Sequence, residues 1–138
     1  PMSIRIRRVC YLYASTEDRP GAIYQLLAQL ADAEVDLLSF SAVPIGPNRA
    51  QLTLFPRDLA RLEKVAPRLG LSLGEEQQAF LIQGDDELGA LADVHRTLYD
   101  ARINVFAATG VTDGQGRFGY LIFVRPEDYE RAAGVLEV

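Results

Sequence analysis

Residues 17–36 read E-D-R-P-G-A-I-Y-Q-L-L-A-Q-L-A-D-A-E-V-D, and residues 85–104 read D-D-E-L-G-A-L-A-D-V-H-R-T-L-Y-D-A-R-I-N. The second stretch repeats the first at an offset of 68 residues, so that Gly89 aligns with Gly21. The same offset aligns Ala90 with Ala22, Leu91 with Ile23, Leu98 with Leu30, Ile103 with Val35, Thr109 with Ser41 and Phe123 with Phe55. Further on the offset becomes 70, which aligns Pro126 with Pro56. An internal repeat predicts one small fold built twice, with sites in related pairs.

The composition is that of an ordinary globular protein. The chain has 138 residues, of which 49% are hydrophobic and 24% charged. This length allows one domain of usual size or two small units that share a core, and a unit of half this size has a thin core by itself. The formal net charge of −5 argues against a nucleic-acid partner, because a phosphate backbone attracts a basic surface.

The sequence contains no apolar run of the roughly 18 residues that a membrane-spanning helix needs. Its first residues show no signal-peptide pattern, so we expect a cytoplasmic protein without a membrane partner. Cys10 is the single cysteine, which excludes a disulfide within the chain. Its neighbours Val9 and Tyr11 favour a packing role in a strand over a catalytic thiol.

The first repeat, residues 1–76, predicts the order strand, helix, strand, strand, helix. Alternating residues predict the strands, and an apolar stripe at positions 23, 26, 27 and 30 predicts the first helix. Pro20 and Pro56 fit the first turn of a helix, and Asp18 or Arg19 is the expected cap of the first one. The expected elements are strands 4–14, 37–43 and 51–55, helices from 20 to about 30 and from 56 to about 69, and a short closing strand 71–73.

The second repeat, residues 77–138, predicts the same order. Its strands are expected at 78–83, 103–111 and 118–124, its first helix carries an apolar stripe at 91, 94, 95 and 98, and its last helix begins at Pro126. The order βαββαβ predicts an α+β fold of the ferredoxin-like kind, an antiparallel sheet with both helices on one face.

The closing strand of the second repeat is short or missing. At the offset of 70, Val138 aligns with Arg68, before the first repeat reaches its own closing strand. Residues 135–138 form a stub strand, or the strand is absent, or residues 3–8 fill its place.

The sequence contains no recognisable set of catalytic residues. His95 is the only histidine and lies on the apolar stripe of its helix, which favours a packing role over that of a catalytic base. No histidines, cysteines or carboxylates cluster at ligand spacing, and Asp85, Asp86 and Glu87 are first of all capping residues before a helix. We therefore expect a protein that is not an enzyme and that has no metal and no cofactor.

Gly21 and Gly89 lie where each first helix begins. Glycine there lets a ligand or another backbone approach closely, and the free N–H groups of a first helical turn bind anions such as a carboxylate. The alternative is that both glycines only permit tight packing between helix and sheet. The residues alone do not separate the two interpretations.

The segments 17–37 and 85–105 resemble the opening of ACT domains, which are small amino-acid-sensing modules of βαββαβ topology. The shared pattern is D-x-P-G, an apolar helix, a small-residue turn and I/V-N/D-I/L. The first repeat carries it at Asp18, Pro20, Gly21, Val35 and Asp36. The second repeat has Leu88 in place of the proline. The chain is similar to stand-alone tandem ACT proteins over nearly its whole length.

The resemblance implies two ACT units side by side in one eight-stranded sheet, with small ligands at unit interfaces. It places each ligand between the strand–helix turn of one unit and the second strand of another. The implied ligand-binding residues are Asp18, Arg19, Pro20, Gly21, Ala22, Ile23, Ser39, Phe40, Ser41, Asp85, Asp86, Leu88, Gly89, Ala90, Leu91, Ala108 and Thr109.

The resemblance therefore implies a non-catalytic regulatory protein that binds an amino acid and forms a homodimer or larger assembly. The alternative function is a ligand-free dimerisation or interaction module that regulates a partner enzyme.

Overall fold

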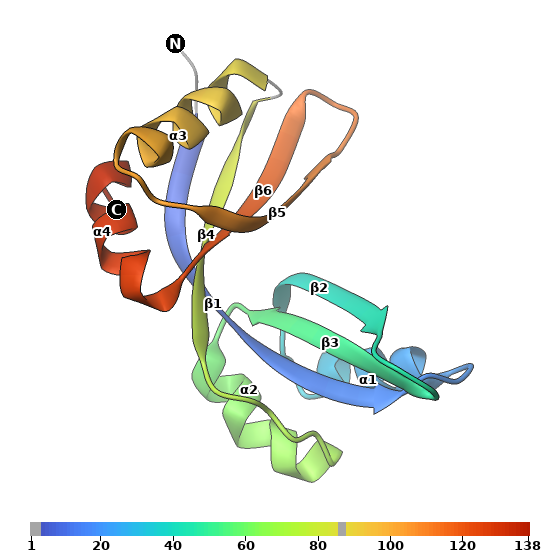
Figure 1. The fold of residues 1–138 in the computed structure, drawn as a ribbon. Coiled ribbons are helices and arrows are strands. Elements are labelled where there is room, and N and C mark those ends of the chain that lie inside the picture. The colour runs from blue at the N-terminus through green and yellow to red at the C-terminus, as the bar shows by residue number, and fades with distance from the viewer. Residues whose placement is uncertain (1–3, 86–87) are drawn as a thin grey trace. The chain divides into compact units, whose positions relative to one another are not determined.

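The computed structural model describes residues 4–85 and 88–138 (Figure 1). The strands are β1 (Ile4–Glu17), β2 (Leu37–Pro44), β3 (Arg49–Pro56), β4 (Gln77–Asp85), β5 (Val105–Thr112) and β6 (Arg117–Val124). The helices are α1 (Ala22–Asp32), α2 (Leu59–Val65), α3 (Leu88–Asp100) and α4 (Tyr129–Leu136), with short 3₁₀ helices at Ala66–Leu69 and Pro126–Asp128. The expected α+β class, with antiparallel strands, is confirmed.

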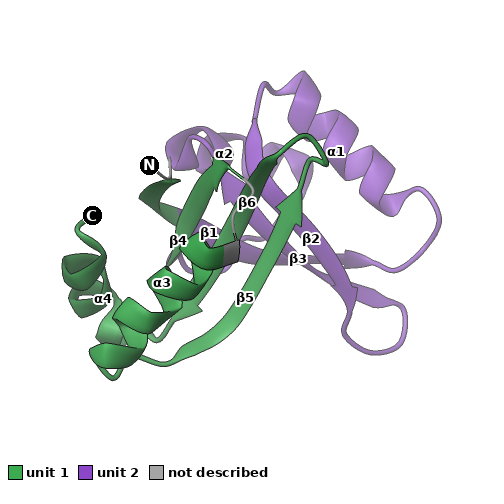
Figure 2. Cartoon of the chain, turned by 90° about the horizontal axis from the view of Figure 1, so that it is seen from above, with its two compact units in different colours: residues 1–9, 78–138 green, residues 10–77 purple. Residues whose placement is uncertain are grey.

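The chain divides into two compact units, coloured separately in Figure 2. One unit is residues 10–77, and the other combines residues 1–9 with residues 78–138. The 14-residue strand β1 therefore contributes residues to both units. The described residues form six strands where the resemblance implies eight, because one long strand serves both units and residues 71–76 form none.

In the unit of residues 10–77, the strands are hydrogen-bonded in the order β2-β3-β1. Alternate residues of the strands point to one face, where Leu12 and Leu54 are buried. Leu26 and Leu30 of α1 pack into the same cluster, as do two residues of α2. Both helices therefore cover the same face of the sheet, as the ferredoxin-like pattern predicts.

The expected closing strand at residues 71–73 does not form. The segment contributes Leu71 and Leu73 to the edge of the core, and the Gly74 N–H donates to the Tyr13 carbonyl at 2.8 Å. A single hydrogen bond to β1 is not enough to define a strand. Residues 71–74 therefore lie beside β1 as an irregular segment.

In the other unit, the hydrogen-bonded order is β1-β4-β6-β5. Its core joins Phe80 and Ile82 of β4 to residues of β6, α3 and α4, and Ile4 and Ile6 of β1 pack against this cluster. The first residues of the chain therefore fill the place of the closing strand, which was one of the three arrangements left open by the sequence.

The C-terminal residues form no stub strand. Helix α4 continues to Leu136, Glu137 adopts a left-handed conformation with φ 62°, and the Val138 N–H donates to the Ala133 carbonyl. Arg8 of β1 contacts the C-terminal segment. Its guanidinium donates hydrogen bonds to the Glu130 carboxylate at 2.8 Å and to the Val138 carbonyl at 3.3 Å.

Two helix starts differ from the expectation. Helix α1 begins at Ala22 after Gly21, so neither Asp18 nor Arg19 is its cap. Pro56 is the last residue of β3, and α2 begins at Leu59 after Asp58, whose carboxylate accepts a hydrogen bond from the Arg61 N–H. An aspartate at this position satisfies an otherwise unpaired N–H group, which a proline cannot do.

Candidate functional site

The turn between β1 and α1 leaves the start of the helix without a side-chain cap. Gly21 occupies the cap position with φ 86°, in the left-handed region that favours glycine, and has no side chain to accept from the first-turn N–H groups. The Ala22 N–H donates to the Arg19 carbonyl at 3.2 Å. The following N–H groups, of Ile23 and Tyr24, belong to a helix end that attracts anions.

The space around both glycines distinguishes the two interpretations that the sequence left open. A Cβ atom built on Gly21 or on Gly89 would meet no described atom within 4 Å. Tight packing of helix against sheet therefore does not explain either glycine. The backbone conformation explains Gly21, and Gly89 lies inside α3 with open space beside it.

Arg19 has the most extensive side-chain contacts of the turn. Its Nε donates to the Glu17 carboxylate at 2.6 Å, and its two terminal nitrogens reach the Pro20 carbonyl and the Gln25 amide oxygen, each at 3.5 Å. The two longer contacts are at the limit of a hydrogen bond. One edge of the guanidinium is thus held by a carboxylate while the other is only weakly engaged.

The strand positions implied by the resemblance lie away from this turn within the same unit. Glu17, at the end of β1, pairs with Arg49, whereas Ser39 and Ser41 of β2 pair with Phe55 and Thr53. Thr53 lies four positions after Arg49 along β3, which corresponds to about 13 Å. A single unit therefore does not bring the two halves of the implied site together.

The second repeat shows a similar separation. Asp85 pairs with Arg117 at the end of β4, while Ala108 and Thr109 of β5 pair with Ile122 and Leu121. Asp86 lies outside the described residues, as does the side chain of Leu88. Ala90 is buried in α3, and Leu91 packs at the edge of the core.

Strands β2 and β5 form open sheet edges in their units. Each has a single neighbour in its unit, β3 for β2 and β6 for β5, and neither sequence, L-L-S-F-S-A-V-P or V-F-A-A-T-G-V-T, contains a charged residue. Each strand has a register irregularity near its start, and β2 ends at Pro44, but the residues between carry no charge that would oppose pairing with another chain.

His95 contacts Tyr120 of β6. Its Nε2 lies 2.8 Å from the hydroxyl oxygen of Tyr120, and the two rings meet edge to face. In the described part of the chain, no group of three or more histidine, cysteine, aspartate or glutamate side chains gathers closely enough to hold a metal ion.

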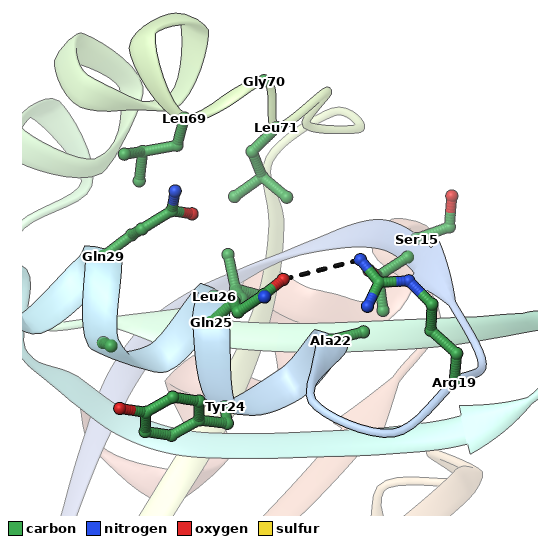
Figure 3. A pocket seen from close by; sticks show the side chains of 12 residues that line it. Ser15, Arg19, Ala22, Tyr24, Gln25, Leu26, Gln29, Leu69, Gly70 and Leu71 are labelled. Carbon is green, nitrogen blue, oxygen red and sulfur yellow. Dashed lines mark hydrogen bonds between the residues drawn. The ribbon is translucent and has the colours of Figure 1, made fainter.

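A hollow beside α1 was not foreseen from the sequence. It has a volume of about 590 Å³ and lies between α1 and residues 69–71 (Figure 3). Gln25 and Gln29, one helical turn apart, contribute amide groups to it. In the sequence of α1, A-I-Y-Q-L-L-A-Q-L-A-D, these are the two amide residues, and their spacing of four was the available indication in the sequence.

No protein-family model and no curated protein sequence matches the chain. Solved structures do match it. A protein of Bacteroides thetaiotaomicron superposes with a TM-score of 0.77 at 15% identity, over 96% of this chain and 88% of that chain. The ligand-free regulatory subunit of aspartate kinase from Thermus thermophilus gives 0.61 at 15% identity, over 98% and 95% of the two chains.

A third match, a structure of aspartokinase alpha and beta subunits, gives a TM-score of 0.52 at 20% identity over 97% of this chain and 94% of that chain. No helix in the described residues is both long and apolar enough to cross a membrane. At these identities the likeness concerns the fold, and the chain shares the ACT-like α+β fold of two small units with these proteins.

Proposed function

We propose that this chain is a non-catalytic regulatory protein that binds a small amino acid, with the ligand carboxylate at the start of α1. The observation that carries the proposal is the uncapped first turn at Gly21, with a left-handed glycine and open space beside it. The helix dipole and free N–H groups favour a carboxylate there. The regulatory subunit of aspartate kinase, which has the same fold, supports a regulatory role.

An edge strand from another unit completes the proposed site. The register keeps Ser39 and Ser41 about 13 Å or more from the turn of their own unit, so the strand that faces the ligand comes from elsewhere. Hydroxyl groups on β2, and Thr109 on β5, supply hydrogen-bond partners without adding charge. We propose that the site at α3 is the weaker one, since Leu88 replaces the proline.

Self-association follows from the same edges. Val43 of β2 and Ile45, just after it, are each 50% exposed, and Val111 of β5 is 74% exposed. On α1, Ile23 and Leu27 of the expected apolar stripe remain more than one-third exposed. We propose a homodimer that covers these residues, in a cytoplasmic protein with no nucleic-acid or membrane partner.

Calorimetry with the twenty amino acids tests the ligand. We expect one or more to bind the wild type at millimolar or lower concentration, and Gly21→Val to weaken that binding, because a branched side chain occupies the open space. Gly89→Val reports on the second site. Gly114→Val is the matched control, since Gly114 also has a positive φ of 73° but lies in the β5–β6 turn. Circular dichroism establishes that each variant folds.

Two results contradict the ligand assignment. If folded Gly21→Val and Gly89→Val bind like the wild type, the turns are not the site. If no amino acid binds the wild type, the ligand-free interaction module replaces the sensor, and the exposed apolar edges are the observation that favours it. Light scattering of the wild type and Val111→Lys tests association, and a monomeric wild type contradicts both functions.

A further inference from the structure

The hollow beside α1 has the size and the lining of a small-molecule site. Its volume of about 590 Å³ lies within the usual range of ligand pockets. Leu26 of α1, Leu69 and Leu71 form apolar walls, and Figure 3 shows the two later leucines directed toward the helix. The hollow belongs entirely to the unit of residues 10–77. Arg19 and Ala22 line it but Gly21 does not, so the hollow begins near the start of α1 and extends along the helix toward Leu69.

One cation faces the hollow. Arg19 lines it, and among the described residues its terminal nitrogens have two contacts, to Pro20 and Gln25, each at 3.5 Å, while Nε is engaged by Glu17. A guanidinium with its terminal nitrogens weakly engaged presents the planar fork that binds a carboxylate through two parallel hydrogen bonds. Because Glu17 pairs with Nε, the terminal nitrogens are the part of Arg19 that is available to a ligand.

Hydrogen-bond donors surround the cation. The Gln25 oxygen faces Arg19 in Figure 3, so its NH₂ group is left to donate, and the Gln29 amide extends between α1 and Leu69. Ser15 accepts a hydrogen bond from Arg49 at 2.6 Å, which leaves its own hydroxyl proton for another acceptor. Ser15 lines the hollow, so the lining favours an acceptor-rich ligand.

None of the described residues that line the hollow is an aspartate or a glutamate. The neighbouring carboxylate of Glu17 is already paired with Arg19, so an ammonium group placed in the hollow lies near a guanidinium of the same charge and has no carboxylate of its own. Two like charges placed close together repel, so the lining discriminates against amino acids.

We propose that this hollow binds a short aliphatic carboxylate that lacks an ammonium group, such as a branched 2-oxo acid. The carboxylate forms two hydrogen bonds with Arg19, the chain packs against the leucines, and an oxo oxygen accepts from an amide of Gln25 or Gln29. The site differs from the proposed amino-acid site in ligand class and in its apolar walls, while Arg19 and Ala22 belong to both sets of residues.

Calorimetry with α-ketoisocaproate, isocaproate and L-leucine tests the proposal. We expect both ammonium-free acids to bind one to one at millimolar concentration, and L-leucine to displace them at least about tenfold less effectively. If α-ketoisocaproate binds more tightly than isocaproate, its oxo group forms a hydrogen bond in the hollow. If the two acids bind equally, the protein recognises the carboxylate and the apolar chain.

Variants locate the binding. Arg19→Gln removes the cation and should weaken binding about tenfold or more, because hydrogen bonds to charged groups contribute most. Gln29→Trp fills the hollow from an exposed helical position and should abolish binding. Arg96→Gln, which makes the same charge change on the exposed surface of α3, should bind like the wild type. Circular dichroism is the check on folding.

Gln29→Trp also separates the two proposals. Gln29 lies seven residues after Ala22, about 10 Å along α1, so this variant should retain the amino-acid binding proposed at the helix start. The inference is overturned if neither acid binds the wild type, if folded Arg19→Gln and Gln29→Trp bind like the wild type, or if L-leucine displaces the acids as effectively as they bind. Failure of the amino-acid site alone leaves these outcomes unchanged.

Discussion

The guanidinium of Arg61 donates two hydrogen bonds to the carbonyl oxygen of Ala33, at 3.0 and 2.8 Å, just beyond the end of α1. The second repeat contains the same contact, from Arg131 to the Ala101 carbonyl. Ala101 follows Ala33 by 68 residues and Arg131 follows Arg61 by 70, the two offsets of the repeat. Each arginine thus ties the second helix of its unit to the end of the first.

We expect Arg61→Met and Arg131→Met each to lower the free energy of unfolding by about 1 kcal/mol, because each removes a charged donor from an unpaired helix-end carbonyl. Urea denaturation measures the change. Arg57→Met, at an exposed position, is the control and should differ little from the wild type. Loss of stability in the control equal to that in Arg61→Met would contradict the assignment.

Gly110 accommodates the ring of Tyr120, its partner across β5 and β6. A Cβ atom on Gly110 would lie 2.6 Å from Cδ1 of Tyr120, so the ring must move and its contact with His95 is disturbed. We expect Gly110→Ala to cost about 1–3 kcal/mol of stability. Gly119→Ala, the neighbouring strand position where a Cβ meets nothing within 4 Å, should cost far less. Thermal unfolding of the two variants gives the comparison.

Tyr11 makes the fold sensitive to high pH. Burial, together with the neighbouring Tyr13, raises the pKa of the Tyr11 phenol from 10.0 to about 12. The folded state thus keeps a proton that the unfolded chain loses near pH 10, and stability falls as the pH rises from 10 to 12. Tyr11→Phe should flatten this dependence in urea denaturation, whereas Tyr99→Phe, at a position that is 70% exposed, should not. An unchanged slope in Tyr11→Phe would assign the effect to other groups.

Cys10 should react slowly in the native protein. Burial is the main cause that raises the pKa of its thiol, and the negative charges of Glu76 and Glu63 act in the same direction. Because the thiolate is the reactive form, alkylation by iodoacetamide at neutral pH should be slower than in the urea-unfolded chain. Equal rates in the two states would show that the native environment does not protect the thiol.

The periodicity of the sequence predicted most elements because local patterns set them. The alternation in β3 and β6 and the apolar stripes of α1 and α3 each fall on the elements found. The helix starts were less accurate, since Pro20 and Pro56 are compatible with several turn geometries. Gly21 is the N-cap of α1 and has a left-handed backbone conformation. The residue pattern alone does not predict this conformation.

By itself, the sequence determined that the order strand, helix, strand, strand, helix occurs twice along the chain, because the repeated spacing of apolar residues and turns fixes which residues each copy buries. Tertiary structure decided that residues 4–9 join the second repeat, since only the folded sheet offers β1 a place beside β4. The tertiary structure also creates the hollow at Gln25 and Gln29 and brings His95 into contact with Tyr120. These features depend on side chains far apart in the sequence, whose distances are set by packing and not by local preference.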